Sequence, residues 1–187
     1  MCRIAGYLGS PVALAEVLSS PPRSLLEQAK SPRDLPRGMV GSDGFGVGWF
    51  VDGRVDPARY RNTMPVWVDE NVATMGTHIT ASCFVASSRT ATREMPVALT
   101  NTAPFVARDT LLVHNGSVDD FHRGPMDRFR AELQLETRAR IFGNSDSEHL
   151  AAFLAETDHA RDLAGRMRAL LLRADACAPP ERARSSR

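Results

Sequence analysis

A glycine-rich stretch, GMVGSDGFGVGWFVDG over residues 38–53, limits the possible folds of this chain more than any other feature. Its glycines at positions 38, 41, 44, 46 and 48 lie around apolar residues. This pattern suits a strand that is entered by a tight turn and approached closely by other backbone. A nucleotide-binding loop is a weaker interpretation, because neither a helical pattern nor a lysine follows the G-x-G. The stretch therefore predicts a closely packed strand inside a sheet.

The first thirty residues predict one strand and two helices. An apolar strand is expected over residues 3–9. Ser10 and Pro11 have the character of an N-cap and a first-turn proline, for a helix that continues through VALAEVL and ends before two prolines. The segment SLLEQAK predicts a second short helix.

The rest of the chain places strands before helices. Further strands are expected over residues 58–62, 82–88 and 110–114, and the last two are apolar enough to be buried. Helices are expected around 125–135, from Ser145 with Glu148 at capping-box spacing, and over 158–174. This order indicates an α+β fold. We expect one domain over residues 1–175 and a disordered tail over 176–187.

Composition and charge exclude several classes of partner. A net charge of +1 without blocks of like charge argues against binding nucleic acid or a membrane surface. The apolar stretches are shorter than the roughly 20 residues that span a bilayer, and no signal peptide precedes Cys2, so we expect a cytoplasmic protein that binds a small molecule. The odd count of cysteines and the lack of a C-x-x-C motif argue against a disulfide framework or a zinc site, and no metal or cofactor is expected. The cysteines are Cys2, Cys83 and Cys177.

Cys2 lies directly behind the initiator methionine and ahead of the first predicted strand. A small residue at this position allows methionine to be removed, which would give Cys2 a thiol and a free α-amine together. Reference pKa values near 8.5 for a thiol and 7.7–8.0 for an α-amine allow the amine to accept the thiol proton near neutral pH. Cys2 is therefore either a terminal nucleophile or a small buried residue at the start of a strand.

Four short stretches, MCRIAGYLG, SRTAT at 88–92, HNG at 114–116 and SDSEH at 145–149, occur in an order that resembles the class II glutamine amidotransferases. These belong to the N-terminal-nucleophile hydrolase superfamily. The stretches GSDGFGVGWF and PARYRNTMPVWVDENV are similar to the branch that contains the γ-glutamyl hydrolase of ergothioneine biosynthesis. The resemblance covers roughly residues 1–155 and implies an αββα sandwich, with residues 1–175 forming the amidotransferase domain.

The resemblance also implies roles for five residues. Cys2 would be the nucleophile, and Asn115 with Gly116 would form the oxyanion hole. Arg89 would hold the α-carboxylate of a glutamine or γ-glutamyl group, and Asp146 would pair with its α-ammonium. Each has an ordinary alternative: an Asn-Gly turn for 115–116, a surface position for Arg89 and a helix start for Asp146.

Other polar residues are expected to have lesser roles. The family assigns no essential histidine to the positions of His114 and His149, and a terminal amine makes a histidine base unnecessary. Asp43 and Gly44 are expected to shape the pocket. The family usually has Asn-Ala before this Asp-Gly, whereas this chain has Gly41 and Ser42.

The sequence supports one main function and two alternatives. The main expectation is an amidohydrolase that cleaves a γ-glutamyl conjugate, such as γ-glutamyl-hercynylcysteine sulfoxide, through a Cys2 thioester and releases glutamate. One alternative is a glutaminase subunit that supplies ammonia to a partner synthase. The other is a truncated, non-catalytic glutamate-binding remnant, because family members continue into further strands. Missing C-terminal strands would leave a sheet that a homodimer or a partner subunit covers.

Overall fold

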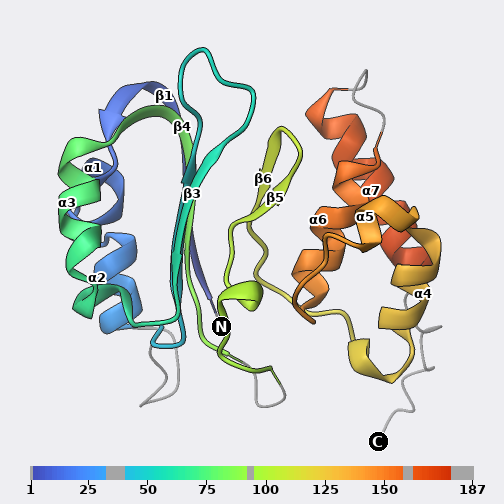
Figure 1. The fold of residues 1–187 in the computed structure, drawn as a ribbon. Helices are drawn as coiled ribbons and strands as arrows, with labels where there is room; N and C mark the ends of the chain where they lie inside the picture. Colours follow the sequence, from blue (N-terminus) through green and yellow to red (C-terminus); the bar gives the residue numbers. More distant parts are fainter. Residues whose placement is uncertain (1, 33–40, 92–94, 158–161, 178–187) are drawn as a thin grey trace, which may run out of the picture. The chain divides into compact units, whose positions relative to one another are not determined.

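The computed structural model describes residues 2–32, 41–91, 95–157 and 162–177. The chain divides into two compact units, Met1–Asn115 and Gly116–Arg187. The first unit contains both sheets, and the second is helical (Figure 1). None of the helices in these described ranges is long and apolar enough to cross a membrane.

The first unit is built on a four-stranded antiparallel sheet with the order β1-β4-β2-β3. A separate hairpin, β5-β6, forms a two-stranded sheet. The strands are β1 Arg3–Ala13, β2 Phe45–Trp49, β3 Ala58–Asn62, β4 Thr80–Ser88, β5 Phe105–Ala107 and β6 Thr110–Leu112.

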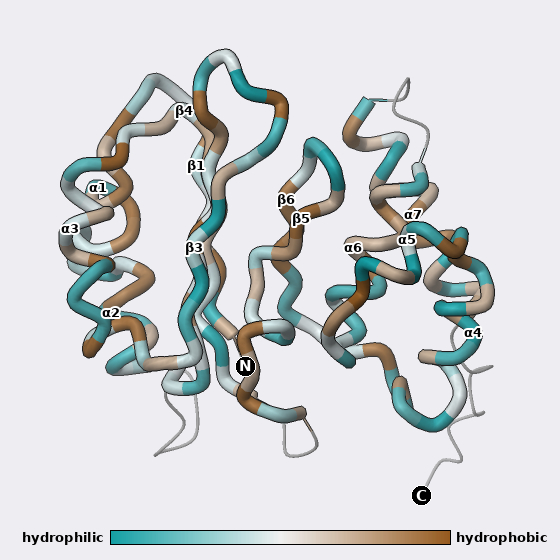
Figure 2. Tube along the Cα trace, in the orientation of Figure 1, coloured by the Kyte–Doolittle hydropathy of each residue, from teal (hydrophilic) through white to brown (hydrophobic). Residues whose placement is uncertain are grey.

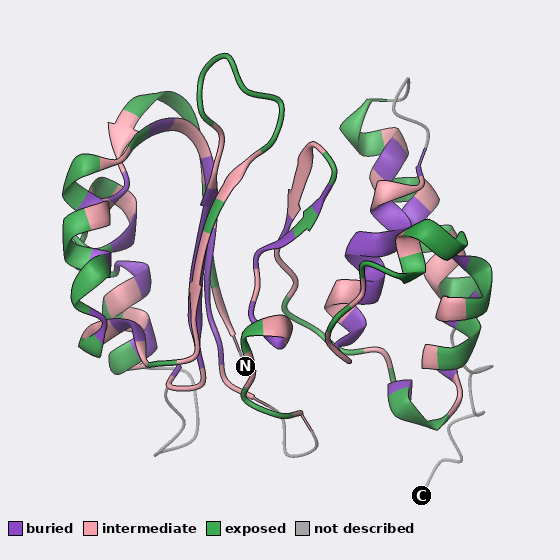
Figure 3. Cartoon of the chain, viewed as in Figure 1, coloured by how far each residue is buried: buried purple, intermediate pink, exposed green. Residues whose placement is uncertain are grey.

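Three helices cover one face of the large sheet (Figure 1). They are α1 Ala15–Leu18, α2 Leu25–Lys30 and α3 Glu70–His78. Apolar and polar residues alternate along them (Figure 2), and their apolar sides pack on the sheet side chains Phe45, Val47 and Phe84. This packing is the hydrophobic core of the unit, and the buried residues follow β2 and β4 (Figure 3).

The glycines of β2 explain how the second sheet approaches the first. Phe45 and Val47 point into the helical core, so Gly46 and Gly48 face the opposite side of the strand. A Cβ atom at Gly46 would collide with the carbonyl oxygen of Ala103, and one at Gly48 would lie 2.8 Å from the side chain of Leu111 in β6. The predicted strand with a close backbone approach is confirmed.

The second unit contains α4 Pro125–Glu132, α5 Leu135–Arg138, α6 Asp146–Ala155 and α7 Leu163–Cys177. Helix α6 is the most deeply buried of these, with its residues 149–154 all buried (Figure 3). Its N-cap Ser145 accepts a hydrogen bond from the backbone N–H of Glu148 at 3.2 Å, as the capping-box spacing predicted. No strand follows β6 in the described ranges.

Several predicted elements differ from the structure. The prediction that a helix begins at Ser10 and Pro11 is wrong. Strand β1 continues to Ala13, and only the single turn α1 follows it. The sequence did not predict helix α3, the hairpin strand β5 or the short 3₁₀ helices η1 Val66–Val68, η2 Leu99–Asn101 and η3 Phe121–Arg123. The expected helix over 158–174 begins only at Leu163, with residues 158–161 outside the described ranges, and it extends to Cys177. The remaining part of the expected tail, 178–187, also lies outside them.

Candidate active site

The backbone brings Cys2 to the end of the central strands. Arg3 of β1 pairs with Ser88 of β4, and Ser88 also pairs with Phe45 of β2. Cys2 therefore precedes β1 at the same end of the sheet where Arg89 follows β4. The partly exposed Cys2 side chain thus lies at a sheet end, which is accessible, rather than in the middle of a strand.

Asn115 is hydrogen-bonded to the backbone of Cys2. The Cys2 N–H donates to Asn115 Oδ1 at 3.2 Å, across 113 positions of sequence. Because the carbonyl end of this amide faces the Cys2 nitrogen, its NH2 end is the one able to donate to a ligand. Two of the predicted site residues are therefore in contact.

Arg89 is fixed in a buried position next to the β2 entrance. Its side chain is 7% exposed, and its backbone N–H donates to the carbonyl oxygen of Gly44 at 2.7 Å. Its two terminal guanidinium nitrogens donate to the carbonyl oxygen of Pro96 at 3.3 and 3.2 Å. Burial lowers the pKa of Arg89, while the nearby charges of Cys2 and Asp43 raise it. Arg89 is thus a buried cation within the electrostatic range of Cys2.

Asp43 joins the turn before β2 to the segment after β4. Its backbone N–H donates to the carbonyl oxygen of Arg89 at 3.0 Å, and its carboxylate accepts from the backbone N–H of Ala91 at 2.8 Å. Gly44, with φ of 133°, has a conformation that side chains rarely tolerate and makes this turn possible. Asp43 thus ties the turn before β2 to residues 89–91, and its role in shaping a substrate pocket stays a prediction.

Asp146 and Gly116 belong to the second unit. Asp146 is buried in the first turn of α6, where its Oδ2 accepts from the backbone N–H of Val118 at 2.8 Å. Its Oδ1 accepts from the backbone N–H of Ser147 at 2.6 Å and from the Ser147 hydroxyl at 3.1 Å. Oδ1 thus uses both of its lone pairs, whereas Oδ2 has a second lone pair that can accept from a further donor. The bond to Val118 fixes the chain just after the HNG stretch.

His149 is fully buried one turn further along α6. Its Nδ1 lies 2.8 Å from the carbonyl oxygen of Ser145, and its Nε2 accepts from Arg130 Nε at 3.1 Å. These two bonds require a proton on Nδ1 and none on Nε2. Burial lowers the pKa of His149, which favours this neutral form. His149 therefore has a structural role, because it joins the N-cap of α6 to Arg130 of α4. The sequence did not predict this role.

The remaining cysteines lie apart from this arrangement. Cys83 is inside β4, where it pairs with Leu8 of β1. Cys177 is buried at the end of α7, and burial raises the pKa of its thiol. Among the residues that the structure describes, no group of three or more histidine, cysteine, aspartate or glutamate side chains is arranged to hold a metal ion.

Comparison with solved structures shows the fold. The chain is similar to a glutamine aminotransferase class-II domain protein from Silicibacter pomeroyi, with a TM-score of 0.65 and 24% sequence identity. The similarity covers 92% of this chain and 62% of that structure. The predicted α+β class and amidotransferase-type fold are therefore confirmed.

Sequence relatives belong to one kind of protein. Over 119 residues, or 64% of this chain, it is 39% identical to the "Gamma-glutamyl-hercynylcysteine sulfoxide hydrolase" of Mycobacterium tuberculosis (strain CDC 1551 / Oshkosh), of which it covers 50%. The protein of the same name from Mycolicibacterium smegmatis is also 39% identical, with 52% covered. The chain thus spans about half the length of these relatives.

The family model described as "Glutamine amidotransferases class-II" matches residues 35–171. This match covers most of the chain, and both the predicted resemblance and the fold agree with it. The chain belongs to the class-II glutamine amidotransferases.

Proposed function

We propose that this chain hydrolyses the amide bond of a γ-glutamyl conjugate, with Cys2 as the nucleophile. The observation that carries the proposal is the contact of the Cys2 nitrogen with Asn115 Oδ1 at 3.2 Å. The contact puts an amide side chain beside the residue that the family resemblance assigns to nucleophilic attack. The names of the relatives favour a γ-glutamyl conjugate as the substrate.

In the proposed reaction, removal of Met1 turns the Cys2 nitrogen from an amide into an α-amine. This amine accepts the thiol proton, directly or through a water molecule, and the thiolate attacks the γ-carbonyl carbon. The carbonyl oxygen becomes an oxyanion, to which the Asn115 NH2 group and the Gly116 N–H donate. The C–N bond then breaks, and the departing nitrogen takes the proton from the α-ammonium.

The second half of the reaction hydrolyses the thioester. The α-amine of Cys2 accepts a proton from water, and the hydroxide attacks the thioester carbonyl. The C–S bond breaks, glutamate leaves, and the thiolate takes up the proton again. Water is the only co-reactant, so the proposed hydrolysis requires no cofactor.

Arg89 and Asp146 would recognise the glutamyl end of the substrate. A guanidinium can hold an α-carboxylate through two parallel hydrogen bonds, and burial of Arg89 strengthens such a contact. The carboxylate of Asp146 would accept from the α-ammonium. A γ-amide that lacks either charge should therefore be a poor substrate.

One assay separates this proposal from its alternatives. Purified protein is incubated with glutamine and with a γ-glutamyl thioether amino acid, and the released glutamate is measured. Preference for the conjugate supports the proposal, whereas preference for glutamine indicates an ammonia-supplying subunit. Binding of glutamate without turnover of either compound indicates a non-catalytic protein.

Association with a second copy or with a partner subunit also remains a proposal. Strand β1 is an edge strand of the large sheet, and its Leu8 side chain is 84% exposed. An open edge that carries apolar side chains is a typical site of association. Sedimentation velocity tests this idea: a monomer at all concentrations would contradict association with a second copy.

A further inference from the structure

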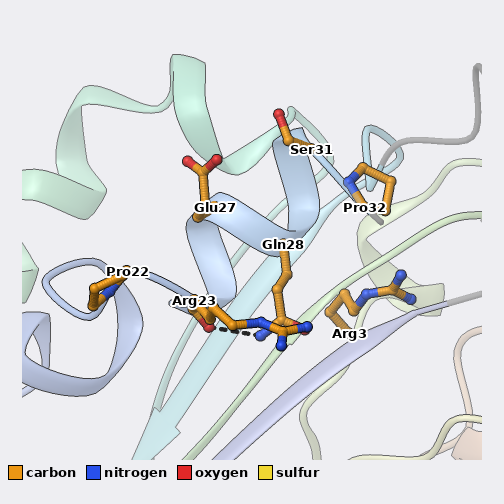
Figure 4. A pocket seen from close by; sticks show the side chains of 7 residues that line it. All are labelled: Arg3, Pro22, Arg23, Glu27, Gln28, Ser31 and Pro32. Atoms are coloured by element: carbon orange, nitrogen blue, oxygen red, sulfur yellow. Dashed lines mark hydrogen bonds between the residues drawn. The ribbon is translucent and has the colours of Figure 1, made fainter. Parts of the chain in front are cut away.

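The two faces of the large sheet have different surroundings near Cys2. On the helical face, a pocket of about 370 Å³ lies beside α2, and Arg3 lines it from the beginning of β1 (Figure 4). Successive side chains of a strand point to opposite faces, so Cys2, directly before Arg3, faces the other side of the sheet. On that side the hairpin β5-β6 and the residues before it approach the glycines of β2. The surroundings of Cys2 are therefore set by the hairpin.

Two arginines of the edge strand β3 hold the segment that leads into the hairpin. Arg61 and Arg59 are the pairing partners of the two β2 glycines under the hairpin, and directly paired side chains point to the same face. Nη1 of Arg61 donates to the carbonyl oxygen of Thr102 at 2.9 Å. Nη1 of Arg59 donates to the carbonyl oxygen of Pro104 at 3.1 Å. Two charged donors of β3 therefore bind residues 102–104.

The register of the hairpin relates this segment to Asn115. Phe105 of β5 pairs with Leu112 of β6. Three residues outward from this pair, toward the open end of the hairpin, the chain has Thr102 on one side and Asn115 on the other. Thr102 is 1% exposed, so it is fixed by packing. A displacement of Thr102 thus moves the end of the hairpin from which Asn115 extends.

The segment before the hairpin already lies against the backbone of β2 and its entry turn. A Cβ atom at Gly46 would collide with the carbonyl oxygen of Ala103, and one at Gly44 would lie 3.1 Å from Thr102 Oγ1. The Thr102 hydroxyl donates to the carbonyl oxygen of Ala98 at 3.0 Å. If the hydrogen bond from β3 is lost, the segment can therefore move only away from the sheet.

We infer that Arg61 is a positioning residue for Asn115, because it fixes the Thr102 end of the hairpin to the large sheet. This inference rests on the proposed function and deepens it by assigning a support to the proposed oxyanion hole. Asn115 Oδ1 accepts from the Cys2 nitrogen at 3.2 Å, and a movement of about 1 Å would break this hydrogen bond and misplace the NH2 donor. Misplacement by about 1 Å can cost about 100-fold in rate.

Steady-state kinetics of Arg61→Gln tests the inference. We expect kcat to fall about tenfold while KM changes by less than about twofold, because the misplaced donor acts mainly in the transition state. Arg59→Gln should lower kcat by a smaller factor, because its acceptor Pro104 lies farther from the open end of the hairpin. Arg54→Gln, at an exposed position in the loop between β2 and β3, is the control and should keep both constants.

A double-mutant cycle shows whether Arg61 acts through Asn115. In the Asn115→Ala background, Arg61→Gln should lower kcat by less than about twofold, because the donor that it positions is already absent. A tenfold loss that persists in this background would overturn the inference, as would a folded Arg61→Gln protein with unchanged kcat. If Arg61→Gln does not fold, the same cycle is measured with Arg59→Gln, and a loss that is equal with and without Asn115 would overturn the inference.

The side-chain NH2 signals of Asn115 give a readout that needs no turnover. In proton–nitrogen NMR spectra they are the pair of signals that is missing in Asn115→Ala. They should shift in Arg61→Gln and stay in place in Arg54→Gln, and unchanged signals in Arg61→Gln would overturn the inference. Failure of the unmodified protein to release glutamate would overturn the proposed hydrolysis instead, and the NMR comparison would still test the position of Asn115.

Discussion

The backbone N–H of Cys2 donates to Asn115 Oδ1 at 3.2 Å, although 113 positions of sequence separate the two residues. This contact joins the start of β1 to the segment that follows β6. It orients the Asn115 side chain so that its NH2 end is available to a ligand. The proposed oxyanion hole depends on this orientation.

Replacing Asn115 by alanine should lower kcat by about 100- to 1000-fold, because one donor to the oxyanion is lost. KM should change little, since this donor acts mainly in the transition state. Steady-state hydrolysis of a γ-glutamyl substrate provides both constants, and thermal unfolding shows whether the variant is folded. A folded variant with kcat within a factor of five of the unmodified protein would remove Asn115 from the mechanism.

Arg89→Lys should raise KM by about tenfold or more, because an ammonium group cannot reproduce two parallel hydrogen bonds to a carboxylate. The loss also affects Pro96, whose carbonyl oxygen accepts from both terminal guanidinium nitrogens. Arg54→Lys, at an exposed position, is the matched control and should leave KM as it is. An unchanged KM in Arg89→Lys would show that this residue does not bind the substrate.

Asp43 should act as an acceptor that positions the Arg89 segment. Asp43→Asn keeps an oxygen that can accept from the Ala91 N–H, whereas Asp43→Ala removes it. We expect Asp43→Ala to raise KM by about tenfold, of the order of one charge-assisted hydrogen bond, and Asp43→Asn to restore most of the loss. Equal defects in the two variants would indicate that the negative charge beside Arg89 matters instead.

His149 should make the stability of the chain depend on pH. Burial lowers its pKa, with Arg130 and His122 also lowering it and Ser145 and Asp146 opposing the shift. As the pH falls, the His149 side chain therefore takes up a proton in the unfolded chain, near its ordinary pKa of about 6.5, before it does so in the folded chain. This contribution to the free energy of unfolding is complete above that pH and is lost as the pH falls toward the native pKa.

Urea unfolding at pH 7.5 and pH 5.5 measures this effect. The unmodified protein should lose more stability between the two pH values than His149→Gln, by up to about 1.4 kcal/mol per pH unit. His78→Gln, at an exposed position, is the control and should behave like the unmodified protein. An equal pH dependence in His149→Gln and the unmodified protein would contradict the neutral, buried state of His149.

The sequence predicted most strands of the large sheet because their signals are local. Strand β3 has the predicted bounds, and β4 begins only two residues early. The error at Ser10 and Pro11 has a physical reason. The pairing of β1 with β4 shifts register between Leu8 and Val12, and a proline is tolerated at such an irregularity in an edge strand.

The sequence contains a start signal for helix α3. Asp69 is its N-cap, and the Asp69 carboxylate accepts from the backbone N–H of Asn71 at 3.1 Å. The same carboxylate accepts from Tyr60 and Asn62 of β3. An N-cap followed by helix-forming residues could have predicted this helix, but the pairing with β3 could not be read from the local sequence.

The site itself could be predicted only in part. Family resemblance supplied the candidate residues, but the contact between Cys2 and Asn115 arises from the packing of segments that are distant in sequence. The link from Asp43 to Ala91 and the bonds of His149 to Ser145 and Arg130 arise in the same way. The cytoplasmic location and the domain limits at 175 and 176 stay predictions.

Intact-mass spectrometry of the protein, quenched during turnover of a γ-glutamyl substrate, tests the central claim most directly. We predict that the active chain has lost Met1 and carries one glutamyl group, which peptide mapping places on Cys2. The bond should be labile to hydroxylamine, as expected for a thioester. An active protein that retains Met1, or a glutamyl group on a residue other than Cys2, would contradict the account.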